Sequence, residues 1–155
     1  MLYTLQTEQF IKSDINTVWD FMSSPANLAK ITPAYMGFDI ITDLGQGGRM
    51  YPGQVIEYYI KPVAGVKMHW VTEITHVQHG EYFVDEQRFG PYKFWHHKHF
   101  LKAVLGGVLM TDSLHYQLPF GIFGRIAHAL FVKKQLKEIF DFRFKKIDEI
   151  FNGVI

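Results

Sequence analysis

The sequence predicts an α+β protein in which one long C-terminal helix packs across a curved antiparallel sheet. Three observations lead to this prediction. One strand and two short helices come first, about six consecutive strands follow, and the last thirty or so residues have a continuous helical period. Helices gathered on one side of an antiparallel sheet give a layered α+β architecture. No repeat or Pro/Gly/Ser-rich linker divides residues 1–155, so we expect a single domain.

The N-terminal elements follow from local signals. Alternation of side chains over Tyr3–Ile11 predicts a strand. Asp14 can N-cap a short helix that runs to Met22. Pro25 suits the first turn of a second short helix, to about residue 31, because its missing N–H costs nothing there.

The middle of the chain is dominated by strand signals. Glycines 45, 47 and 48 predict a loop after the first of these strands, and Pro62 is expected to end the second. The turn His79-Gly80 separates the next two. The predicted strands are Tyr35–Thr42, Gln54–Ile60, Lys67–Val77, Glu81–Arg88, Tyr92–Leu105 and Val108–Leu118.

The last element is a long amphipathic helix from Ile122 to about Phe151. Its apolar residues recur three and four positions apart, with most lysines and glutamates off that stripe. At 1.5 Å per residue, such a helix is about 45 Å long and can cross a whole sheet. A curved sheet that grips one long helix leaves a concavity of the kind in which ligands bind.

One hairpin can be assigned a register. Gly106 and Gly107 can both take positive φ, which favours a two-residue loop with Leu105 opposite Val108. The same count of residues then fixes every other cross-strand pair of the hairpin. It predicts the pairs Trp95–Leu118, His97–Tyr116, His99–Leu114 and Leu101–Asp112.

This register places four polar side chains, His97, His99, Asp112 and Tyr116, on the face that points at the helix. Buried polar groups need hydrogen-bond partners. Three interpretations stay open: a satisfied core network, a polar spot on a pocket wall, or a metal or acid–base site. Two histidines with one carboxylate can bind zinc or iron, but His-x-His alone is a weak signal, and we expect no metal and no cofactor.

The preceding strand is less constrained. A three-residue loop at Gly90-Pro91 would aim Phe83, Asp85 and Gln87 inward, whereas a two-residue loop would aim Tyr82, Val84 and Glu86 inward. We include Asp85 and Gln87 as candidate ligand contacts, and His69, His76, His79, His96, His115 and His128 are expected at the surface. The full set of candidate ligand-binding residues is Trp70, Asp85, Gln87, Trp95, His97, His99, Asp112, Tyr116 and Phe140.

Composition excludes several classes of function. The net charge of +1 argues against a nucleic-acid partner, and the absence of cysteine removes disulfides and thiolate chemistry. No signal peptide and no integral membrane segment are expected, which fits a cytoplasmic protein. Aromatic residues make up 16% of the chain, and bulky rings suit a core or the walls of an apolar cavity. A homodimer stays open.

The residues also resemble a known superfamily. The run from Phe83 to Tyr92, followed by Trp95, His97 and His99, is similar to a bacterial subgroup of the START-like (SRPBCC) superfamily. Further matches are Gly106-Gly107, Asp112, Tyr116, Leu118-Pro119, Gly121, Gly124, Phe140 and Arg143. This subgroup is described as cyclase/dehydrase-like or cell-division-inhibitor-like, and the superfamily includes birch-pollen-allergen-like proteins.

The resemblance implies a helix-grip fold with seven strands, two short helices and a cavity under the C-terminal helix. It favours binding or transport of a hydrophobic or amphipathic small molecule. A cyclase or dehydratase is the first alternative, with His97 or His99 as base, Asp112 orienting it and Tyr116 as donor. A protein-interaction module is the second alternative. It depends on the apolar run Leu118–Phe123, which we expect to be buried.

Overall fold

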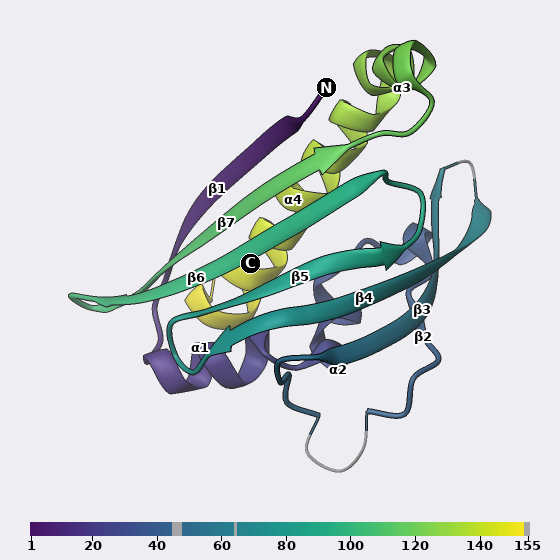
Figure 1. The fold of residues 1–155 in the computed structure, drawn as a ribbon. Coiled ribbons are helices and arrows are strands. Elements are labelled where there is room, and N and C mark those ends of the chain that lie inside the picture. The colour runs from purple at the N-terminus through teal and green to yellow at the C-terminus, as the bar shows by residue number, and fades with distance from the viewer. Residues whose placement is uncertain (45–47, 64, 154–155) are drawn as a thin grey trace.

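The computed structural model describes residues 1–44, 48–63 and 65–153 and has one seven-stranded antiparallel sheet (Figure 1). The strand order is β1-β7-β6-β5-β4-β3-β2, so the first strand pairs with the last and the others form a meander. The predicted glycine loop falls partly on residues 45–47, which lie outside the described ranges. The strands are β1 (Tyr3–Ile11), β2 (Asp39–Ile40), β3 (Gln54–Val63), β4 (Val66–Gln78), β5 (Tyr82–Phe89), β6 (Phe94–Val104) and β7 (Gly107–Gln117).

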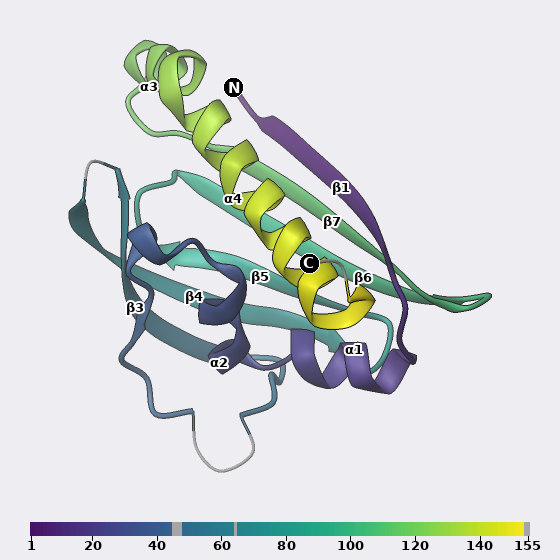
Figure 2. The same ribbon diagram turned by 180° about the vertical axis from the view of Figure 1, so that it is seen from behind.

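Two short helices follow β1. Helix α1 (Ile15–Met22) begins as predicted, because the Asp14 carboxylate accepts hydrogen bonds from the backbone N–H groups of Asn16 and Thr17. Helix α2 (Pro25–Leu28) has Pro25 in its first turn and continues as a 3₁₀ turn, Ala29–Ile31. Both lie at the lower end of the sheet in Figure 2, where they close the space between the sheet and the long helix.

The C-terminal helix is continuous from residue 121 to residue 152, as the sequence predicts. Helix α3 (Gly121–Ala127) joins α4 (Lys133–Ile147) through the π-helical turn His128–Val132, and the rod ends in a second π-helical turn, Asp148–Asn152. Every junction residue keeps right-handed helical φ and ψ.

The helix lies diagonally over the concave face, across β1, β7 and β6, while β3 and β4 curve away from it (Figure 2). Leu136, Phe140 and Ile147 of α4 are buried against the sheet. Gln9 of β1 ties the two layers together, since its amide donates to the Phe144 carbonyl at 2.8 Å and to Asp148 at 2.9 Å. The long helix therefore packs closely against the β1–β7–β6 side of the sheet and does not cover the β3–β4 side.

Two predicted strand boundaries are wrong. Tyr35–Thr42 was predicted as one strand, but Ala34–Met36 forms a 3₁₀ turn and only Asp39–Ile40 pairs with β3. Pro62 does not end β3, because the pairing with β4 shifts register between Ile60 and Val63 and resumes beyond it. Such an irregularity accommodates a residue that cannot donate a ladder hydrogen bond.

The predicted hairpin register is wrong by two residues. Val104 pairs with Gly107, so the loop is Leu105-Gly106, and only Gly106 has positive φ. Gly107 is required for a different reason: a Cβ there would lie 2.2 Å from the Ile11 carbonyl oxygen of β1. Because a shift of two residues preserves which face each side chain occupies, the predicted inward face is correct.

Candidate functional site

A cavity of about 140 Å³ lies between the concave face of the sheet, the two short helices and α4. Its walls are mainly apolar and come from every layer of the fold. An engineered apolar cavity of similar size, about 150 Å³, admits benzene. The apolar lining includes Met22, Leu28 and Ile31 from the short helices, Ile56, Tyr58, Trp70, Ile74 and Phe83 from the sheet, and Leu136, Ile139 and Phe140 from α4.

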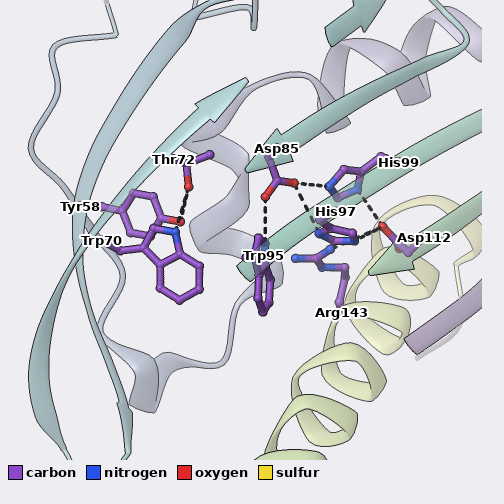
Figure 3. Close-up of polar contacts among 9 residues, drawn as sticks. All are labelled: Tyr58, Trp70, Thr72, Asp85, Trp95, His97, His99, Asp112 and Arg143. Atoms are coloured by element: carbon purple, nitrogen blue, oxygen red, sulfur yellow. Dashed lines mark hydrogen bonds and ion pairs between the residues drawn. The ribbon is translucent and has the colours of Figure 1, made fainter. Parts of the chain in front are cut away.

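The polar part of the wall is a cluster of two histidines and two aspartates (Figure 3). Strand pairing sets His97 opposite Asp85 on one side, and His99 opposite Asp112 on the other. The His99 Nε2 atom lies 2.8 Å from Asp85 Oδ2, and His97 Nε2 lies 3.0 Å from Asp112 Oδ1. The indole N–H of Trp95 donates to Asp85 Oδ1 at 3.2 Å. Two cross-strand contacts thus bring together side chains that no local pattern links.

Burial and neighbouring charges shift the pKa values of the four groups in this cluster. Burial lowers the pKa of His97, and the positive charge of His99 lowers it further. For His99 the lowering by burial is outweighed by the Asp112 carboxylate, so its pKa is raised. Burial also raises the pKa of Asp112, but the charge of His99 and the hydrogen bond from His97 bring it well below 3.8. The same balance, with His97 and His99 as partners, lowers the pKa of Asp85. Burial and the neighbouring charges thus shift the two imidazoles in opposite directions, with the pKa of His97 lowered and the pKa of His99 raised.

Arg143 of α4 completes the site and was not among the predicted residues. Its guanidinium lines the cavity, stacks 5.2 Å over the Phe140 ring and lies 3.8 Å from Asp112. Its buried Nε and Nη1 atoms make no hydrogen bond to the part of the chain described. The signal was present in the sequence, since Arg143 falls three residues after Phe140 and four before Ile147, on the apolar stripe of the helix.

With Arg143 included, the formal charges of the cluster cancel when His99 is protonated. Asp85 and Asp112 contribute two negative charges, Arg143 contributes one positive charge, and the raised pKa of His99 favours a second positive charge there. A buried group of charges with zero net charge is tolerated far better than an unpaired ion. Within the described residues, the Arg143 Nε and Nη1 atoms still lack a hydrogen-bond acceptor, which leaves them available to a bound molecule.

A second set of hydrogen bonds fixes the part of the wall formed by β3 and β4. The Thr72 hydroxyl oxygen accepts the indole N–H of Trp70 at 3.0 Å and shares a 2.9 Å hydrogen bond with the Tyr58 hydroxyl. Burial raises the pKa of Tyr58, so it stays a neutral phenol. These bonds hold both aromatic rings in place against the cavity (Figure 3).

Six of the nine predicted site residues line the cavity: Trp70, Asp85, Trp95, His97, His99 and Phe140. Asp112 lies behind the two histidines, and Gln87 instead braces the β5–β6 turn through hydrogen bonds with the backbone N–H and carbonyl of Tyr92. The Tyr116 hydroxyl pairs with His128 Nε2 at 2.8 Å, away from the cavity lining. Tyr116 therefore does not stand where the predicted proton donor would be needed.

Two expectations about exposure are wrong. His128, expected at the surface, is buried between Tyr116 and the stacked ring of Tyr3. The run Leu118–Phe123, expected to be buried, is largely exposed where α3 extends beyond the end of the sheet (Figures 1 and 2). We call this surface the α3 apolar patch. It consists of Phe120, Ile122, Phe123, Ile126, Leu130 and Phe131.

The patch borders a second hollow, of about 520 Å³, beneath α3. Pro62 and Tyr92 line both this hollow and the cavity, so the two spaces lie on either side of the same side chains. Phe120, at the start of the helix, has a φ of 64°, and it is the one described residue other than glycine with positive φ. No helix within residues 1–44, 48–63 and 65–153 is long and apolar enough to cross a bilayer.

The order of elements, the curved seven-stranded sheet and the helix across its concave face define a helix-grip fold of the Bet v 1-like type. Solved structures share it. The protein CV1439 from Chromobacterium violaceum superposes with a TM-score of 0.69 at 14% identity over 93% of this chain and 94% of its own. The major latex-like protein 151 from Panax ginseng gives 0.68 at 16% identity over 97% of each chain. Ara h 8.0201 superposes with a TM-score of 0.64 at 16% identity, over 97% of each chain.

These likenesses confirm the fold implied by the START-like resemblance and extend no further. No protein-family model matches the chain, and no curated protein matches it by sequence. Function must therefore be argued from the cavity itself.

Proposed function

We propose that the protein binds an amphipathic small molecule whose apolar body occupies the cavity and whose anionic group meets Arg143. The observation that carries this proposal is a buried guanidinium in a mainly apolar cavity, whose Nε and Nη1 atoms have no hydrogen-bond partner among the described residues. Leaving such donors unsatisfied is costly, and a carboxylate or sulfonate would pair with them. The aromatic wall of β3 and β4, with Trp70 and Tyr58 fixed by Thr72, would pack against a ring or a short chain.

A matched pair of small probes tests the proposal. Benzenesulfonate carries an anionic group on a single ring, and benzene is its uncharged parent. We expect Arg143→Met to weaken binding of the sulfonate by about 10- to 100-fold, the usual worth of a hydrogen bond to a charged group, and to leave binding of the uncharged probe nearly unchanged. Isothermal titration calorimetry measures both affinities.

Lys145→Met is the control variant, because Lys145 is an exposed cation on the same helix. It should change neither affinity. Equal losses for both probes in Arg143→Met would mean that the substitution damages the cavity, and no loss for the sulfonate would refute a role for Arg143.

A second candidate function, peripheral docking on an anionic membrane surface, is favoured by the α3 apolar patch. Phe120 is 80% exposed, and Phe123 and Leu130 are each 74% exposed. The same three- and four-residue spacing continues from Leu130 onto the exposed Lys133, Lys134 and Lys137. No acidic residue occurs between Asp112 and Glu138 in the sequence. Apolar and basic side chains on one outer helix surface are typical of interfacial helices.

We expect the protein to sediment with vesicles of phosphatidylcholine and phosphatidylserine, and less with phosphatidylcholine alone. The double variant Phe123→Ser, Leu130→Ser should lose this binding. In the control variant Phe89→Ser a phenylalanine 61% exposed on the sheet is replaced, and binding should be kept. If the double variant instead converts a dimer to a monomer in sedimentation velocity, with vesicle binding absent, the patch is an interface between two copies of the chain.

A further inference from the structure

Three donor atoms converge at the polar wall of the cavity. Asp85 Oδ2, a ring nitrogen of His97 and a ring nitrogen of His99 all lie within 4.8 Å of one another. His99 Nε2 is 2.8 Å and His97 Nδ1 is 3.4 Å from the same carboxylate oxygen (Figure 3). Two imidazoles and one carboxylate form a ligand set suited to zinc or to other divalent first-row transition metals, and unsuited to calcium or magnesium.

The far side of each candidate ligand is held by another group. Asp112 Oδ1 lies 3.0 Å from His97 Nε2 and 2.7 Å from His99 Nδ1, so one buried carboxylate contacts both rings from behind. The Trp95 indole holds the second oxygen of Asp85. Metal-binding histidines characteristically have their other nitrogen against a carboxylate, which fixes the ring and raises its basicity. All three ligands therefore have the support that a metal site requires.

The spacing between His97 and Asp85 fits a shared ion. His97 Nε2 contacts Asp112, so Nδ1 is the ring nitrogen that faces Asp85 Oδ2, at 3.4 Å. Two donor atoms that are each about 2.0–2.2 Å from one tetrahedral zinc are about 3.4 Å apart.

We propose that Asp85, His97 and His99 bind one divalent transition-metal ion at the cavity wall, with Asp112 positioning both histidines. Because Asp85, His97 and His99 all line the cavity, such an ion would have open coordination positions facing it. Asp112, behind the rings, is a positioning residue and not a ligand. This site goes beyond binding of a small molecule in the cavity and does not depend on it.

The test uses the full chain, stripped of metal by a chelator and titrated with Zn²⁺ and with Co²⁺. We expect one ion per chain by calorimetry and visible absorption bands of four-coordinate Co²⁺. His97→Ala, His99→Ala and Asp85→Ala should each weaken Zn²⁺ binding at least about 100-fold, and Asp112→Asn by about 10- to 100-fold. His96→Ala is the matched control, because His96 pairs with Glu86 on the outer face of the same strand.

The wild-type titration needs no variant, so it decides the question even if a substituted chain fails to fold. Absence of saturable Zn²⁺ binding overturns the proposal, and so does unchanged binding in a folded double variant His97→Gln, His99→Gln. Binding of benzene to the metal-free protein is measured separately. If the protein binds this probe but no metal ion, the metal-site proposal is refuted and the proposed small-molecule binding is not.

Discussion

Replacing Asp112 by alanine is expected to lower the free energy of unfolding by about 3–5 kcal/mol, the typical cost of removing one partner from a buried charge cluster. Asp112 is 1% exposed and is the carboxylate that both His97 and His99 contact. Without it, His97, His99 and Arg143 would lose a carboxylate that lies within 3.8 Å of all three side chains. Urea denaturation followed by circular dichroism measures the loss.

Asp39→Ala provides the control, because Asp39 is exposed and far from the cluster in the strand order. Its effect should stay within about 0.5 kcal/mol. If Asp112→Ala lowers the free energy of unfolding as little as Asp39→Ala does, the cluster is solvated in solution.

The dependence of stability on pH should show the contribution of the Asp112 carboxylate. The pKa of Asp112 in the folded protein lies well below its ordinary 3.8, so the folded state binds fewer protons than the unfolded state in acid. Its contribution to stability is present above pH 3.8 and is lost as the pH falls toward the folded-state pKa. The free energy of unfolding of the wild type should therefore fall more steeply below pH 4 than that of Asp112→Asn.

The second large effect is expected from filling the cavity. Ile139 lines it from α4, and Ile139→Trp would place an indole in a space of about 140 Å³. Binding of benzene should weaken by about 100-fold or more, equal to about 2.7 kcal/mol. The melting temperature should not fall, because the new ring fills existing space and displaces no packed side chain.

Ile150→Trp makes the same chemical change near the end of the rod, where the side chain is 45% exposed. It should bind the probe like the wild type. If Ile139→Trp also binds the probe normally, the probe occupies another site, and the hollow beneath α3 is the next site to test.

The hairpin shows how far sequence reasoning could go with the site. Two adjacent glycines indicated a turn, but only Gly106 is needed for the turn, and Gly107 leaves room for the Ile11 carbonyl of β1, far earlier in the chain. The register was therefore wrong by two residues, while the face was right, because side chains alternate with a period of two. His97, His99 and Asp112 were predicted to point inward for this reason alone.

The role of each residue depended on its neighbours across strands. Asp112 was placed diagonal to His99, whereas it lies directly opposite, and Asp85 completes the cluster from the next strand. Arg143 was missed because a charged residue on an apolar helix stripe is expected to be solvated unless its partners are known. The exposed α3 apolar patch was missed because an apolar run is ordinarily buried, and only the length of the sheet relative to the helix leaves it uncovered.

The sequence by itself determined the order of elements, the inward face of β6 and β7, and the continuous C-terminal helix. These features follow from side-chain periodicity, which is local. Only the tertiary structure decided which polar groups meet, where the cavity lies and which apolar side chains stay in water. These three features depend on strand register and on how far the helix extends past the sheet. Both are set by contacts between residues far apart in the chain, which no local sequence pattern encodes.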